Sequence, residues 1–229
     1  MKIIFLDTET TGVEETDRLC QIAYKYHGED ICYQSLFKPP VPMSVEAMAI
    51  CHITNKMLED KKPFIGSKDF KDLELEFQGD DTILVAHNAQ FDMRFLLKEG
   101  LNMPKQHICT MKLAHYHDKK AELGKHTLQY LRYYHDLPME DGIMAHEARS
   151  DVLVLEKLYE WFLEHYTVEE MVKISSVPIL YKKMPFGKYK GDWFKDIARK
   201  DLDYLLWMRR GMALDEDMKH TVEYHINNR

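Results

Sequence analysis

The chain has 229 residues, of which 45% are hydrophobic and 30% charged, and its formal net charge is −7. This balance is typical of a globular protein and excludes a disordered chain. The first apolar run covers only residues 3–6 before Asp7, which is too short for a signal peptide or a membrane span. We therefore expect a cytoplasmic protein with no membrane partner.

The cysteines and the charges indicate which kinds of site and partner the chain can have. The four cysteines stand alone, with no CxxC pair, which favours reduced thiols over a zinc site or a disulfide framework. Residues 181–200 contain seven basic and two acidic residues, a net charge of +5, so the rest of the chain carries −12. An acidic body with one basic segment is compatible with nucleic-acid binding, because the distribution of charge matters more than its total.

Strands and helices are expected in a mixed order along the chain. Short apolar runs that lead into helical patterns predict an α/β fold, a mixed β-sheet flanked by helices. Pro39, Pro40 and Pro42 mark a loop. The expected strands are 3–6, 19–26, 31–37 and 82–85, with a turn at 8–12, and the expected helices are 44–58, 91–99, 110–117, 127–134 and 151–166.

A boundary near residues 175–178 divides the chain. We predict a catalytic domain over 1–170, a small basic strand–turn–helix module over 178–211 and a helical C-terminal tail over 212–229. Within the module, residues 186–191 resemble a strand and tight turn, and residues 193–208 a helix. We expect the aromatic side chains Trp193, Tyr204 and Trp207, with Leu205, to form a small core.

The first acidic motif is Asp7-Thr8-Glu9, at the end of the first strand. Strand side chains alternate between faces, so Asp7 and Glu9 project to the same side. Two carboxylates so placed repel each other unless cations lie between them. A polar turn after a strand is the alternative interpretation.

The second motif places Asp92 between a strand and a helix, on the same helix face as Phe95 and Leu96. A carboxylate on a packed face needs a partner, because burial of an unpaired charge is costly. The alternative is an acid that only favours the helix N-terminus.

The third motif is His146-x4-Asp151, which leads into an apolar helix. Asp151 is in line with Leu155 and Leu158 on the core face of that helix. His146 lies five residues earlier and cannot share that face. A helix cap at Asp151 or Ser150 with a surface histidine is the alternative.

Taken together, the carboxylates predict a site for hard cations such as Mg²⁺ or Mn²⁺. Two such ions about 4 Å apart suit phosphodiester hydrolysis. A histidine with a pKa near neutrality can take a proton from the attacking water.

The ordered set of motifs resembles the DEDDh group of the DnaQ-like exonuclease superfamily. The match rests on FLDTETTG at residues 5–12, HNAQFD at 87–92 and the H-x4-D pair. The resemblance implies an RNase H-like fold and release of nucleoside 5′-monophosphates from 3′ ends. It implies that Asp7, Glu9, Asp92 and Asp151 hold two Mg²⁺ (or Mn²⁺) ions, and that His146 is the general base.

The same resemblance implies further contacts with the substrate. Glu9 and Thr10 would contact the terminal 3′-hydroxyl, Val13 would wedge beside the terminal bases, and Asn88 and Phe91 would line the pocket. One position departs from the pattern: Cys51 stands where relatives carry a histidine, and His52 follows it.

Lys188 and Lys190 flank Tyr189 in the basic segment, a combination that suits phosphates and stacked bases. We therefore expect these lysines to contact DNA.

The sequence predicts a 3′→5′ exodeoxyribonuclease that acts on single-stranded DNA 3′ ends. A 3′-exoribonuclease similar to ribonuclease T stays open, because DNA and RNA differ at the 2′-position, which the motifs do not address. An inactive nucleic-acid-binding adaptor and a proofreading subunit of a polymerase also stay open. The oligomeric state is undetermined, a homodimer included.

Overall fold

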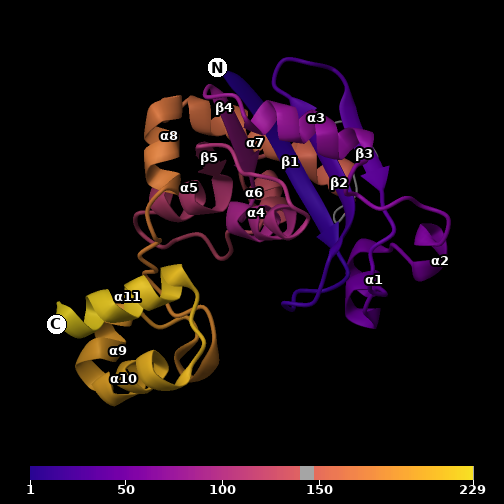
Figure 1. The fold of residues 1–229 in the computed structure, drawn as a ribbon. Helices are drawn as coiled ribbons and strands as arrows, with labels where there is room; N and C mark the ends of the chain where they lie inside the picture. The colour runs from indigo at the N-terminus through magenta and orange to yellow at the C-terminus, as the bar shows by residue number, and fades with distance from the viewer. Residues whose placement is uncertain (140–146, 229) are drawn as a thin grey trace.

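A computed structural model describes residues 1–139 and 147–228. It contains a five-stranded mixed sheet in the order β3-β2-β1-β4-β5, with helices on both faces (Figure 1). The central strand β1 runs antiparallel to β2 and parallel to β4. The strands are β1 (Lys2–Thr10), β2 (Leu19–Tyr26), β3 (Cys32–Leu36), β4 (Thr82–Ala86) and β5 (Gln106–Cys109). This architecture confirms the expected mixed sheet flanked by helices.

The helices cover the two faces of the sheet unequally. One apolar cluster joins Ile3 and Phe5 of β1 to α5, α6, α7 and α8, whereas a second joins Ile4 and Leu6 to α3 and α4. The helices of the sheet domain are α1 (Val45–Cys51), α2 (Asn55–Leu58), α3 (Lys68–Phe77), α4 (Ala89–Lys98), α5 (Thr110–His117), α6 (Leu128–Tyr134), α7 (Ala148–Leu163) and α8 (Val168–Ser175).

The alternation of β1 continues beyond its apolar residues. Because every second side chain shares a face, Asp7 and Glu9 follow Ile3 and Phe5 toward α7. The side chain of Thr8 projects from the opposite face of β1, toward α4. The central strand therefore distributes its polar end between the two layers of helices.

The C-terminal module has a core of its own, set apart from the sheet (Figure 1). Its elements are the 3₁₀ turn η1 (Gly187–Tyr189), α9 (Phe194–Lys200), α10 (Leu202–Gly211) and α11 (Glu216–Asn227). Phe194, Leu205, Met208 and Val222 belong to one buried cluster. The segment predicted as a separate tail therefore packs, as α11, against α9 and α10.

A buried ion pair joins this module to the sheet domain. Lys112 Nζ of α5 lies 3.4 Å from Asp217 Oδ1 of α11, and both side chains are buried. Lys112 also donates to the carbonyl of Val177, and Asp217 accepts from the amide of Ile179. The remaining hydrogen-bonding capacity of both charges is thus partly used, which reduces the cost of burying them.

Several predicted elements require correction. The turn expected at residues 8–12 begins later, because β1 continues through Thr10. The helix expected over 44–58 is interrupted at His52, which adopts a left-handed conformation with φ 58° after the end of α1. The helix expected over 151–166 is α7, which spans Ala148–Leu163. Strand β5 and helices α3 and α8 were not predicted.

The module also differs from its expected strand–turn–helix form. Residues 187–189 form a 3₁₀ turn, and the strand character is limited to one bridge between Lys183 and Trp193. The helix expected over 193–208 is two helices, because Asp201 ends α9 and its side chain caps α10 by accepting from the amide of Tyr204. Trp207 was expected in the core of the module, but its side chain is 54% exposed.

No helix within the described ranges is long and apolar enough to cross a membrane. All four cysteines lie in those ranges and are free thiols.

Candidate active site

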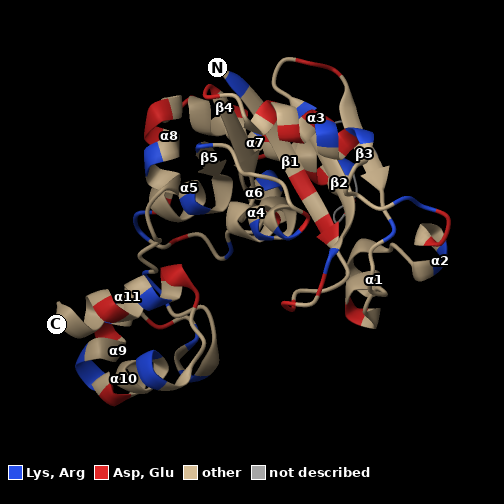
Figure 2. Ribbon diagram, in the orientation of Figure 1, with Lys and Arg blue, Asp and Glu red and all other residues tan. Residues whose placement is uncertain are grey.

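Three carboxylates meet at the carboxyl end of β1. One oxygen from each of Asp7, Glu9 and Asp151 lies within 4.8 Å of the other two. Asp7 and Glu9 come from the central strand, and Asp151 from the first turn of α7. The alternation of β1 therefore places its two acids on one side of the strand, as the sequence predicted, and that side faces the helix that carries Asp151. Figure 2 shows the acidic end of β1 within the sheet domain.

The fourth expected carboxylate, Asp92, approaches from the other side of the strand. It is 2% exposed on the packed face of α4, and its Oδ1 accepts hydrogen bonds from Thr8 N at 3.0 Å and Thr8 Oγ1 at 2.8 Å. Asp92 is outside the group of three but close enough to affect the pKa values of Asp7 and Glu9.

Burial and like charges determine the electrostatics of this site. Burial raises the pKa of Asp7 well above its usual range, and the charges of Asp92, Glu9 and Asp151 raise it further. Burial also raises the pKa of Glu9 to about 8, with the charge of Asp151 as the next cause. The pKa of Asp92 is raised to about 7 by burial, although the hydrogen bonds from Thr8 favour its ionised form. A cluster that resists ionisation in this way is stabilised by cations.

Gln129 of α6 supports the site and was not found from the sequence. Its Nε2 donates to Asp151 Oδ1 at 2.6 Å. Thr8 is the second residue that sequence reasoning missed, although its position between two predicted ligands on a strand could have placed it on the opposite face. Gln129 offered no such clue, because its contact spans 22 residues of sequence.

Neither Asp151 nor Ser150 caps α7, as the alternative interpretation of the third motif required. The N-cap residue is Glu147, and the Ser150 hydroxyl donates to Glu147 Oε2 at 2.6 Å instead of capping the helix. Asp151 is a buried side chain of the first turn. His146 lies outside the described residues, directly before Glu147 in sequence.

The residues expected at the substrate pocket lie on two neighbouring segments. Thr10 ends β1 beside a register shift between Glu9 and Thr10, and its hydroxyl donates to the carbonyl of Gly12. Val13 is 66% exposed in the following loop. Asn88 is exposed, with φ 65°, and precedes α4, which carries the half-buried Phe91.

Helix α4 also holds the loop that presents Val13. Arg94 donates to the carbonyl of Val13 at 3.1 Å, and Lys98 Nζ donates to the carbonyls of Glu14 at 3.3 Å and Glu15 at 2.6 Å. The helix that carries Asp92 therefore also sets the position of Val13.

The two residues at the sequence departure, Cys51 and His52, lie in different environments. Cys51 is buried in a small apolar cluster at the end of α1, and its thiol pKa is raised by burial. His52 is exposed, in the left-handed conformation that histidine adopts more readily than most residues.

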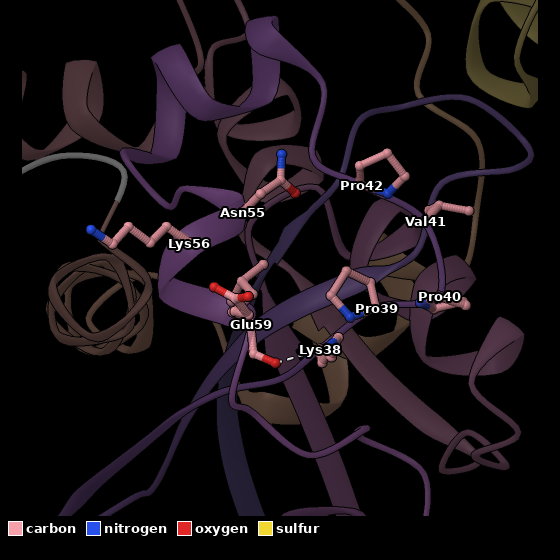
Figure 3. Close-up of a pocket in the computed structure, with 9 residues that line it drawn as sticks. Lys38, Pro39, Pro40, Val41, Pro42, Asn55, Lys56 and Glu59 are labelled. Carbon is pink, nitrogen blue, oxygen red and sulfur yellow. Dashed lines mark hydrogen bonds between the residues drawn. The ribbon is translucent and has the colours of Figure 1, made fainter.

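A pocket of about 500 Å³ beside α2 is separate from the carboxylate cluster (Figure 3). It lies between the proline loop and α2, where Lys38 Nζ donates to the backbone carbonyl of Glu59 at 2.8 Å. Its lining contains none of the clustered carboxylates.

Comparisons with known proteins agree with this geometry. A family model described as Exonuclease, of the RNase T family, matches residues 4–159. Exodeoxyribonuclease 10 of Escherichia coli strain K12 is 31% identical, over 97% of this chain and 98% of its own length. The PolC-type DNA polymerase III of Thermotoga maritima is 31% identical, over 82% of this chain but 14% of the polymerase. A structure of exonuclease X in complex with 5′ overhanging duplex DNA has a TM-score of 0.60 and 29% identity, over 76% of this chain and 99% of that chain.

An RNase H-like sheet with a carboxylate cluster at the end of its central strand defines a nuclease hydrolase. The chain belongs to the family of RNase T and DnaQ-like 3′→5′ exonucleases. The sequence also predicts a resemblance to exodeoxyribonuclease X in particular, carried by residues 43–50, 53–54, 108–114 and 186–191. The similarity to that enzyme over nearly the whole chain confirms this prediction.

Proposed function

We propose that this exonuclease removes mononucleotides from the 3′ ends of DNA and prefers single strands. The observation that carries the proposal is the cluster of Asp7, Glu9 and Asp151 at the end of β1. DNA as the substrate is supported by the relatives: one is named an exodeoxyribonuclease, and the similar solved structure holds 5′ overhanging duplex DNA.

Asp7, Glu9, Asp92 and Asp151 are the proposed ligands of two Mg²⁺ or Mn²⁺ ions. The donors present fit such ions, because all are carboxylate oxygens, which hard cations prefer. The raised pKa values of Asp7 and Glu9 support the same assignment, since bound cations relieve the repulsion that contributes to them. When bound, a pair of divalent ions supplies positive charge to the attacking and leaving oxygens of the displacement.

The protein's own groups would position the terminal nucleotide. Glu9 and Thr10 are proposed to contact the 3′-hydroxyl, and the register shift between them supports this, because bulges commonly re-aim side chains near active sites. Val13, Asn88 and Phe91 are proposed to flank the terminal bases. The exposure of Val13 on a loop held by α4 is consistent with that role.

His146 is the proposed general base. It immediately precedes Glu147, the N-cap of the helix that carries Asp151. To accept a proton from the attacking water, its imidazole must be neutral, so the rate is expected to fall as the pH drops below the pKa of that histidine.

The division into a catalytic domain over 1–170 and a basic module is also proposed to be functional. Lys190 is exposed at the module surface, as DNA contact requires. Lys188 is exposed as well, although its Nζ lies 2.9 Å from Asp201 Oδ2. The four free thiols are consistent with a reducing, cytoplasmic location.

The direct test uses 5′-labelled DNA and RNA oligonucleotides, single- and double-stranded, with Mg²⁺. We expect a ladder that shortens from the 3′ end, fastest on single-stranded DNA and absent with a chelator or with Asp7→Asn. Equal cleavage of a circular single strand would instead identify an endonuclease. Faster cleavage of RNA would favour the exoribonuclease alternative.

A further inference from the structure

A cleft lies between the sheet domain and the C-terminal module, with a volume of about 490 Å³. One wall is the loop that joins α5 to α6, including Lys125 and His126. The other wall comes from the module, including Tyr181 and Lys190. The cleft exists only because the module docks on this loop.

Two lysines of the module fix that docking through backbone carbonyls. Lys182 Nζ donates to the carbonyls of His115 at 3.0 Å and Asp118 at 2.7 Å. Lys183 Nζ donates to the carbonyl of Ala121 at 2.9 Å. These contacts hold the two walls in a defined relation.

The loop on the other wall is organised from within. The carboxylate of Asp118 accepts from the amides of Glu122 at 2.8 Å and Leu123 at 3.2 Å, and His126 Nε2 lies 3.2 Å from its Oδ2. The ring of His126 also stacks on His115 at a centroid distance of 3.7 Å. Lys125 is therefore presented from a structured loop.

The charge of the cleft is positive. Its described lining includes Lys125, Lys182, Lys183 and Lys190, against the single carboxylate of Asp118, which is directed to its own loop. Lys182 and Lys183 are used in docking. Lys125 and Lys190 are exposed and lie on opposite walls.

The chain connects the lining of the cleft to the carboxylate site. His126 and Thr127 line it, and the next helix, α6, carries Gln129, which contacts Asp151. His87 Nε2 lies 2.9 Å from the carbonyl of His126, and His87 directly precedes Asn88. Asp151, a proposed metal ligand, and Asn88, a proposed pocket residue, are thus both linked to the segment of residues 126–127 that lines the cleft.

We infer that this cleft binds the phosphate backbone of the substrate strand as it leaves the catalytic carboxylates, with Lys125 and Lys190 as the phosphate contacts. The inference rests on the proposed function. It adds a second contact with the same DNA strand, at a segment remote from the scissile bond. A nucleic-acid strand suits the cleft because cations on two facing walls can contact successive phosphates of one polyanion.

The test compares the wild type, a Lys125→Ala/Lys190→Ala double variant and a Lys71→Ala control. Lys71 is exposed on α3, which lies far from the module (Figure 1). Dissociation constants for single-stranded DNA of increasing length are measured with a chelator, over a range of salt concentrations, and turnover is measured with Mg²⁺.

For long strands the double variant is expected to raise Kd on the order of tenfold at low salt and to flatten the log–log salt slope by about 1.4. The Lys71→Ala variant should match the wild type in Kd, in salt slope and in turnover. An unchanged Kd and slope for long strands, or an equal loss in Lys71→Ala, would overturn the inference while leaving wild-type exonuclease activity intact. A wild type that degrades no DNA would refute the proposed function itself.

Discussion

Gln129 Nε2 lies 2.6 Å from Asp151 Oδ1, so an amide of α6 holds one oxygen of a carboxylate in the acidic cluster. The hydrogen bond restricts the rotation of the Asp151 side chain at the base of α7. Loss of a group that orients a metal ligand in this way typically costs about 10- to 100-fold in metal affinity or activity. Gln129 is thus a positioning residue for the proposed metal site.

Replacement of Gln129 by leucine should weaken the apparent affinity for metal, with an increase of about 10- to 100-fold in the Mg²⁺ or Mn²⁺ concentration needed for half-maximal rate. The thermal midpoint should change much less. A metal titration of the cleavage rate measures the effect. Gln78→Leu, at the exposed end of α3, is the matched control. An unchanged titration curve for Gln129→Leu would show that the contact does not position Asp151.

The stability of the metal-free protein should fall as the pH rises from about 5 to 8. The pKa of Glu9 is raised to about 8, that of Asp92 to about 7, and that of Asp7 well above its usual range. Folding therefore favours protonated carboxyls, and their contribution is present below the unfolded-state pKa values and lost as the pH passes the folded values. Thermal midpoints with a chelator across this range would measure the loss.

Two companion measurements separate this effect from general pH sensitivity. Mn²⁺ should raise the thermal midpoint more at pH 8 than at pH 5.5, because it binds the ionised carboxylates. Asp7→Asn should raise the metal-free midpoint at pH 8, because it removes one charge from the cluster. A lower thermal midpoint for Asp7→Asn at pH 8 would show that repulsion between the clustered carboxylates does not destabilise the metal-free protein.

His146→Ala should slow single-turnover cleavage on the order of 10²–10⁴-fold, the usual contribution of a positioned general base. The acid limb of the pH–rate profile should disappear with the imidazole. DNA affinity should change little, because the four carboxylates and the cleft remain. A variant with the wild-type rate and the same acid limb would exclude His146 from the mechanism.

Asp217→Ala should destabilise the protein by about 3–5 kcal/mol, because it leaves Lys112 buried without its carboxylate partner. The exposed pair of Lys68 and Asp72 provides the comparison, and Asp72→Ala should cost about 1 kcal/mol or less. Chemical denaturation of both variants measures the two costs. Equal small losses would show that Lys112 finds other partners when the ion pair is absent.

Strand and helix periodicity alone was enough to predict the faces on which the four acids lie. Alternation brought Asp7 and Glu9 to one face, and helical spacing placed Asp92 and Asp151 on packed faces. The start of α7 was predicted three residues late, because Glu147 is not among the residues that commonly cap helices.

Other elements had no clear local pattern. Strand β5 was missed because it begins with Gln106 and His107, which leaves Ile108 and Cys109 as its only apolar residues. The break between α9 and α10 depends on Asp201, which ends one helix and caps the next. The exposure of Trp207 depends on how α10 packs against α11, which periodicity does not define.

The module is attached to the sheet domain largely through lysine contacts with main-chain oxygens, at His115, Asp118 and Ala121 on one side and Val177 on the other. Every residue type supplies such an oxygen, so these acceptors are independent of the side chains in the loop. Sequence drift in the loop can therefore change the character of the cleft while the junction persists. Substitutions in this loop that spare Asp118 are therefore expected to change the lining of the cleft and to leave these main-chain acceptors in place.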